Sequence, residues 1–157
     1  MARSTPWAIL ACEFSDTTAH VGSLDYLRSL YTDAGVGTGN IVDYFDTVSH
    51  GAIDLGGSEV FGWLDLQRPR TDYIGNVPDD KTPSGKLNRN GLIRHARSIA
   101  RENDIDLSRF FSVVVTTTPA VDLFGNIVPY GALAATNTTP QLLMQEMGHG
   151  YGLQHSR

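Results

Sequence analysis

Apolar residues follow two recurring patterns along the chain, and each pattern predicts a different kind of element. Short continuous apolar runs bounded by polar residues predict buried strands at residues 7–14 and 111–117, and a weaker strand at 127–135. Apolar residues spaced three or four positions apart predict amphipathic helices instead. Such helices are expected at residues 22–35, 41–48, 88–102 and 139–150.

Glycine and proline mark two places where these patterns break. Gly56-Gly57 separates segments 52–55 and 58–66, which are therefore expected to form a hairpin or a bulged strand pair. Residues 67–86 contain three prolines and two glycines. This composition predicts one long irregular segment, of a kind that is usually functional or mobile.

The order of the elements indicates the fold class. Strands alternate with helices along the sequence, which favours an α/β fold with a twisted mixed sheet and helices packed on it. The chain has 157 residues, a length typical of one domain. We therefore expect residues 1–157 to form a single domain.

Composition and charge narrow the range of partners. The net charge is −5 and no stripe of Lys and Arg is present, so no nucleic-acid partner is expected. No apolar run approaches the ~18 residues that a membrane span needs. The first residues contain only about six consecutive apolar positions, too few for the core of a secretory signal peptide. The single cysteine, Cys12, cannot form an internal disulfide.

The segment 145–155 carries the residues with the most specific chemistry. Positions 145 and 149 of a helix lie one turn apart on the same face, where two histidines could hold one Zn²⁺. Position 149 is His and position 145 is Gln. Glu146 lies beside that face, well placed to accept a proton from a zinc-bound water. Gly152 can adopt a positive φ and end the helix, so that the chain turns back and brings His155 to the same metal.

These residues match the extended zinc signature His-Glu-x-x-His-x-x-Gly-x-x-His at every functional position except the first, where the chain has Gln145. The segment thus resembles the metzincin clan of zinc metallopeptidases. A second tract, Tyr-Phe-Asp-Thr-Val-Ser-His-Gly-Ala-Ile-Asp-Leu at 44–55, is similar to one in secreted metallopeptidases of the immune inhibitor A and gametolysin type.

The resemblance implies a zincin-like fold and a zinc-dependent metalloendopeptidase, a hydrolase that cleaves peptide bonds of a protein or peptide substrate. Glu146 would be the general base, His149 and His155 would be zinc ligands, and Gln145 would occupy an altered ligand position. An extended substrate would pair with the edge of the strand within 127–135. The resemblance also implies an extracellular location, and a catalytic domain truncated before the lower subdomain that carries a methionine turn.

Gln145 and the truncation leave two alternatives open. An amide oxygen is a weaker zinc donor than an imidazole, so the site could be decayed and the chain a catalytically inactive pseudopeptidase that binds a protein or peptide. The chain could also be a fragment without activity of its own. Retention of Glu146 favours the peptidase, because a binding module needs no general base.

Overall fold

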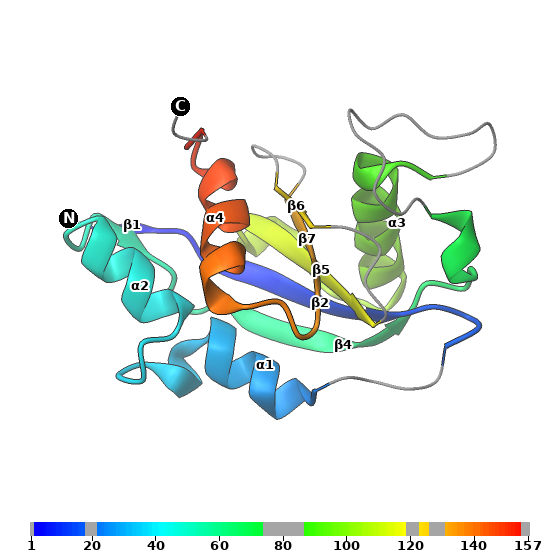
Figure 1. Cartoon of the computed structure of the whole chain (residues 1–157), viewed down its shortest axis with the longest axis horizontal. Helices are drawn as coiled ribbons and strands as arrows, with labels where there is room; N and C mark the ends of the chain where they lie inside the picture. Colours follow the sequence, from blue (N-terminus) through cyan, green and yellow to red (C-terminus); the bar gives the residue numbers. More distant parts are fainter. Residues whose placement is uncertain (1, 18–21, 74–86, 119–122, 126–130, 155–157) are drawn as a thin grey trace.

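A five-stranded mixed sheet lies at the centre of the computed structural model, which describes residues 2–17, 22–73, 87–118, 123–125 and 131–154. The strand order is β4-β2-β5-β7-β6, in which the first four strands are parallel and β6 is antiparallel to β7. The strands, shown in Figure 1, are β2 (Trp7–Glu13), β4 (Glu59–Asp65), β5 (Ser112–Thr118), β6 (Phe124–Gly125) and β7 (Ala132–Ala135).

Strands β2 and β5 form the buried centre of the sheet because almost every side chain on them is apolar or β-branched. Alternate residues of β2 enter two separate clusters, one on each face of the sheet. Ala8, Leu10 and Cys12 belong to one cluster, and Trp7 and Ile9 belong to the other. A strand that is buried on both faces has a continuous apolar run in its sequence. Such runs predicted both β2 and β5 correctly.

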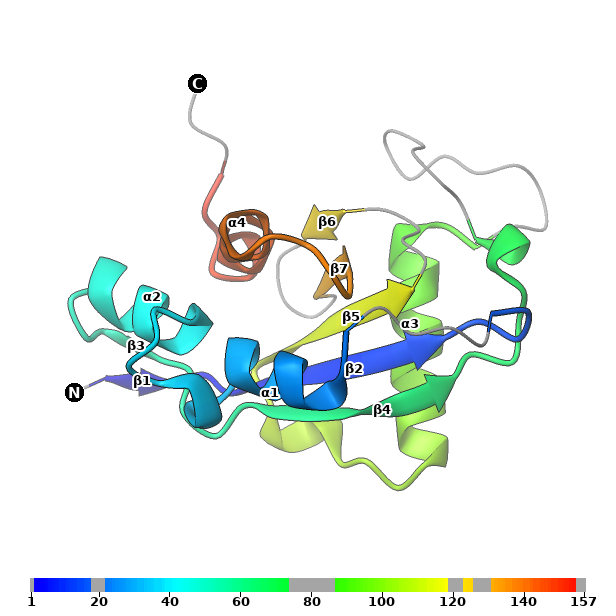
Figure 2. The same ribbon diagram turned by 60° about the horizontal axis from the view of Figure 1, so that its bottom comes forward.

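Helices cover both faces of the sheet. Helix α3 (Arg89–Glu102) packs on one face, whereas α1 (Leu24–Tyr31), α2 (Ile41–Val48) and α4 (Pro140–Gly150) contribute to the cluster on the other. Figure 2 shows α3 behind the sheet and α1 in front of it. No helix in the described ranges is long and apolar enough to cross a membrane.

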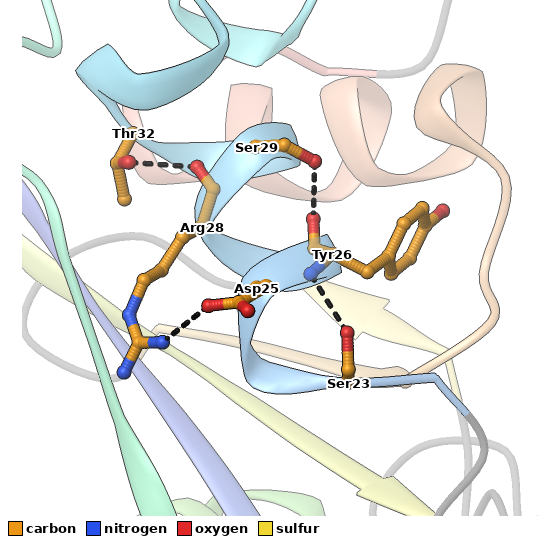
Figure 3. A network of polar contacts seen from close by, with 6 residues as sticks. All are labelled: Ser23, Asp25, Tyr26, Arg28, Ser29 and Thr32. Atoms are coloured by element: carbon orange, nitrogen blue, oxygen red, sulfur yellow. Dashed lines mark hydrogen bonds and ion pairs between the residues drawn. The ribbon is translucent and has the colours of Figure 1, made fainter.

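Side-chain caps set the ends of α1 (Figure 3). The Ser23 hydroxyl accepts a hydrogen bond from the backbone N–H of Tyr26 at 3.1 Å, and the Thr32 hydroxyl donates to the Arg28 carbonyl at 2.6 Å. Thr32 itself has extended backbone angles. The helix predicted for residues 22–35 therefore ends earlier, and a short 3₁₀ turn follows it.

The predicted α/β class with a mixed sheet is confirmed, but the expected hairpin or bulged strand pair across Gly56-Gly57 is wrong. The segment before the glycine pair forms β3 (Ile53–Asp54), which pairs in parallel with β1 (Arg3–Ser4), and β4 pairs with β2. The turn between them is held by carboxylates: Asp54 accepts from the N–H of Gly56 at 2.8 Å, and Asp33 accepts from the N–H of Gly57 at 3.0 Å. This turn passes the chain from one sheet to the other instead of folding it back.

The strand predicted at 127–135 is confirmed only in its second half, as β7, and residues 126–130 lie outside the described residues. On β7, β5 pairs with one side, and β6 pairs on the other side with Ala132 and Leu133. The expected pairing of a substrate with the edge of this strand stays a prediction. The segment predicted to be irregular begins with a 3₁₀ turn at Arg70–Asp72, and residues 74–86 are not described.

Candidate functional site

Helix α4 carries three of the predicted site residues, Gln145, Glu146 and His149, and packs against the sheet. It begins with Pro140 directly after Thr139 and contacts β6, β7 and α2. Leu143 and Met147 are buried in the cluster shared with α1 and α2. Because these two side chains fix the rotation of the helix, Gln145 lies on its exposed side.

Glu146 and His149 lie next to each other near the C-terminal end of α4. Oε2 of Glu146 is 3.9 Å from Nε2 of His149, and the two side chains are only 11% and 16% exposed. The spacing of three residues places both on neighbouring positions of one helical face. The structure therefore brings together two of the residues to which the motif assigns chemistry.

The backbone fixes the tautomer of His149. Its Nδ1 lies 2.6 Å from the carbonyl oxygen of Leu153. A carbonyl oxygen only accepts, so Nδ1 carries the proton, and the lone pair of the neutral imidazole is on Nε2. Histidines that bind metals commonly donate their other ring N–H to a backbone carbonyl in this way. The proton arrangement is thus the one required of a metal-binding Nε2.

The turn after α4 places the Leu153 carbonyl in this position. Gly152 has φ +83°, its N–H donates to the carbonyl of His149 at 2.9 Å, and the N–H of Leu153 donates to the carbonyl of Gly148 at 3.2 Å. These two bonds define a Schellman motif, in which a glycine takes the left-handed position. The expectation that Gly152 ends the helix is confirmed.

A cavity of about 460 Å³ borders the exposed side of α4. Gln145 and His149 line it from α4, and Tyr44 lines it from α2. Two further glutamines, Gln141 and Gln154, also line the cavity. The altered ligand position and the predicted zinc ligand thus lie on the same wall.

Sequence reasoning missed a close backbone contact on the other side of α4. A Cβ atom on Gly125 would lie 2.2 Å from the carbonyl oxygen of Glu146, so only glycine allows β6 this close to the helix. In the sequence, the only sign of this contact is Gly125 itself. Without the fold, nothing connects that glycine to position 146.

Tyr151 is the second feature that the sequence did not reveal. Its hydroxyl accepts a hydrogen bond from Nε1 of Trp7 at 3.0 Å and lies 2.8 Å from the hydroxyl oxygen of Thr5. These partners are 144 and 146 positions away in the sequence, beyond the reach of any local pattern. A tyrosine inside the motif therefore anchors the end of α4 to the start of β2.

Of the two predicted histidine ligands, His149 lies among the described residues. Among them, no group of three or more His, Cys, Asp or Glu side chains could hold a metal ion. His155 is outside the described residues, so the predicted three-ligand set stays a prediction. His149 fits zinc by its tautomer and position, whereas Gln145 offers a neutral amide oxygen, a weaker donor for this metal. Of these two side chains, His149 is the donor that suits zinc, and Gln145 would bind the ion less tightly.

Comparison with known proteins assigns the chain to no family. No protein-family profile matches the sequence, and no curated protein matches it.

Proposed function

We propose that the chain is a zinc-dependent metalloendopeptidase with a zincin-like fold, acting on a protein or peptide substrate. The observation that carries this proposal is the pairing on α4 of a carboxylate and an imidazole whose tautomer is fixed. Oε2 of Glu146 lies 3.9 Å from Nε2 of His149, while Nδ1 of the same ring is bound to the Leu153 carbonyl. The position of α4 directly after β7, with β6 against it, supports the zincin-like arrangement.

Each residue has a defined role in this proposal. Zinc supplies Lewis acidity, which lowers the pKa of a coordinated water and polarises the substrate carbonyl. His149 and His155 would hold the ion, with Nε2 of His149 as donor. Glu146 takes the proton of the attacking water at its carboxylate and returns it to the leaving amine. Its low exposure keeps this carboxylate away from bulk water.

The residue at position 145 determines the zinc affinity that we expect. Its amide oxygen contributes less to zinc binding than an imidazole at the same position. We expect zinc to bind to the natural chain weakly, and Gln145→His to tighten zinc binding by at least about tenfold, comparable to the effect of lesser changes around metal ligands.

A second candidate function is supported by the lining of the cavity. Gln141, Gln145 and Gln154 all face it, and amides of this kind pair well with the N–H and C=O groups of a peptide backbone. On this alternative the chain is a pseudopeptidase that binds a peptide without cleaving it.

Zinc binding and peptide hydrolysis by matched variants distinguish the two functions. Zinc affinity is measured by competition with a chromogenic chelator for the natural chain, Gln145→His and Gln141→His. The last variant adds a histidine to the same cavity but eight positions from His149, so it should not strengthen the site. Hydrolysis of a mixed peptide library is compared between the natural chain and Glu146→Gln, which preserves shape and removes the base.

The proposal requires that zinc binds, that Gln145→His alone tightens it, and that Glu146→Gln abolishes hydrolysis. Failure of Gln145→His to bind zinc or cleave any peptide would overturn it. Binding of intact peptides by such a chain would favour the pseudopeptidase.

A further inference from the structure

The hydroxyl of Tyr151 lies within a directed chain of hydrogen bonds. The indole Nε1–H of Trp7 can only donate, so the Tyr151 oxygen accepts from it at 3.0 Å. The Thr5 hydroxyl donates to the carbonyl of Asp54 at 3.3 Å. The Tyr151 hydroxyl must therefore donate to the oxygen of Thr5 across their 2.8 Å separation. The two hydroxyls each accept from one neighbour and donate to the other, an arrangement in which neighbouring bonds strengthen one another.

Aromatic packing fixes the ring of the same tyrosine. It stacks on Phe111 with ring centroids 4.9 Å apart and an angle of 12° between the planes, and it contacts Phe45 at 5.4 Å. Burial raises the pKa of the Tyr151 hydroxyl, an effect that the hydrogen bonds to Thr5 and Trp7 partly offset. We call Thr5, Trp7 and Tyr151 the Tyr151 clasp.

The clasp acts on the first residue of the turn that follows α4. Tyr151 is the C-cap of the helix, and its N–H donates to the carbonyl of Gly148 at 3.0 Å. The next residue, Gly152, takes the left-handed conformation, and the one after it supplies the carbonyl that binds Nδ1 of His149. Only Gly152 therefore separates Tyr151, whose side chain is anchored, from Leu153, whose carbonyl binds Nδ1 of His149.

We propose that Tyr151 is a positioning residue for His149: the clasp holds the turn after α4 so that the Leu153 carbonyl keeps the imidazole protonated on Nδ1. The inference deepens the proposed function, because this tautomer directs Nε2 toward a metal. In this proposal Thr5, just before β2, and Trp7, the first residue of β2, help to hold the site in place although they are far from His149 in the sequence.

The test measures the tautomer of His149 directly, in the full-length chain without metal. Long-range ¹H–¹⁵N correlation spectra distinguish imidazoles protonated on Nδ1 from those protonated on Nε2, and the His149 signals are those missing from His149→Gln. Three variants are compared with the natural chain. Tyr151→Phe keeps the stacked ring and removes the hydroxyl, Thr5→Val removes its acceptor, and Thr5→Ser retains it.

We expect the natural chain to be protonated on Nδ1. In Tyr151→Phe and Thr5→Val the ratio of the two tautomers should shift by about fivefold toward Nε2–H, the effect of losing one typical hydrogen bond. Thr5→Ser should restore the natural ratio. Tyr31→Phe is the matched control: it removes another buried hydroxyl from the same apolar cluster and should leave His149 unchanged.

Two results would overturn the inference. One is an Nε2-protonated His149 in the natural chain, and the other is an unchanged tautomer ratio in folded Tyr151→Phe and Thr5→Val. If the tautomer responds as expected but no variant binds zinc, the positioning role holds and the proposed peptidase function fails. The zinc competition assay on the same samples separates these cases.

Discussion

Replacing Gly125 by alanine would force β6 and α4 apart at the level of Glu146. The new Cβ would lie 2.2 Å from the carbonyl oxygen of Glu146, and 2.8 and 2.9 Å from its carbonyl carbon and Cα. Ordinary contact begins at 3.4 Å, which exceeds the shortest of these distances by 1.2 Å. All three atoms belong to the backbone, so no side-chain rotation relieves the overlap.

This overlap lowers the free energy of unfolding, because β6 or α4 must move to make room for the new methyl group. Inserting a methyl group into a filled space costs about 1–3 kcal/mol. For a domain of this length, this corresponds to a fall in Tm of about 3–9 °C. Thermal and urea unfolding monitored by tryptophan fluorescence measure it. Hydrogen exchange of the α4 amides should accelerate in the same variant, because the helix loses its support at β6.

Gly148→Ala is the matched control, two residues along α4 from the contact at Glu146. There the nearest atom to a new Cβ is the side-chain Cδ1 of Leu153 at 3.4 Å, an ordinary contact. Because alanine favours a helix interior over glycine by up to about 1 kcal/mol, this variant should be as stable as the natural chain or more so. Equal stability of Gly125→Ala and the natural chain would refute the close approach of β6 to α4.

Two further predictions concern the stability of the whole fold. Burial raises the pKa of three tyrosine hydroxyls, those of Tyr31, Tyr73 and Tyr151. The unfolded chain releases these protons near pH ~10 while the folded chain retains them, so the contribution of the three hydroxyls to stability should be constant below about pH 10 and fall above it. Urea midpoints on either side of pH ~10 measure this fall, and a flat profile there would contradict the burial. Leu10→Ala, at a fully buried position of β2, should cost about 2–5 kcal/mol in urea unfolding. Val48→Ala, at a position 51% exposed, should change stability by less than about 0.5 kcal/mol; similar losses in both variants would contradict the assignment of the core.

The sequence predicted those elements whose patterns are local and long. Helix α3 spans 14 residues with one apolar face, and its bounds match the expectation within a residue. Strands β1 and β6 have two residues each, too few to show any alternation. The hairpin was predicted wrongly for a different reason. Two apolar segments around a glycine pair look the same whether they pair with each other or with distant strands.

In the candidate site, too, the features set by local pattern were predicted and those set by long-range contacts were not. Helical periodicity alone placed Glu146 beside His149, and the glycine three positions later correctly predicted the end of the helix. The contacts that support the site, from Gly125 and from the Tyr151 clasp, connect segments far apart in the sequence. A single sequence carries no signal for such pairs, because each partner satisfies only its own local pattern.

The position of β2 in the sheet has a consequence for the order of folding. This strand lies between β4 and β5, and its first residue, Trp7, pairs with Ser112, which follows 105 positions later. Pairings of such long range close slowly, because a large loop must lose its entropy before the contacts form. Helix α4 packs on β6 and β7, which themselves depend on β5. The surface on which α4 packs therefore exists only after β5 has joined β2 and β7 has joined β5.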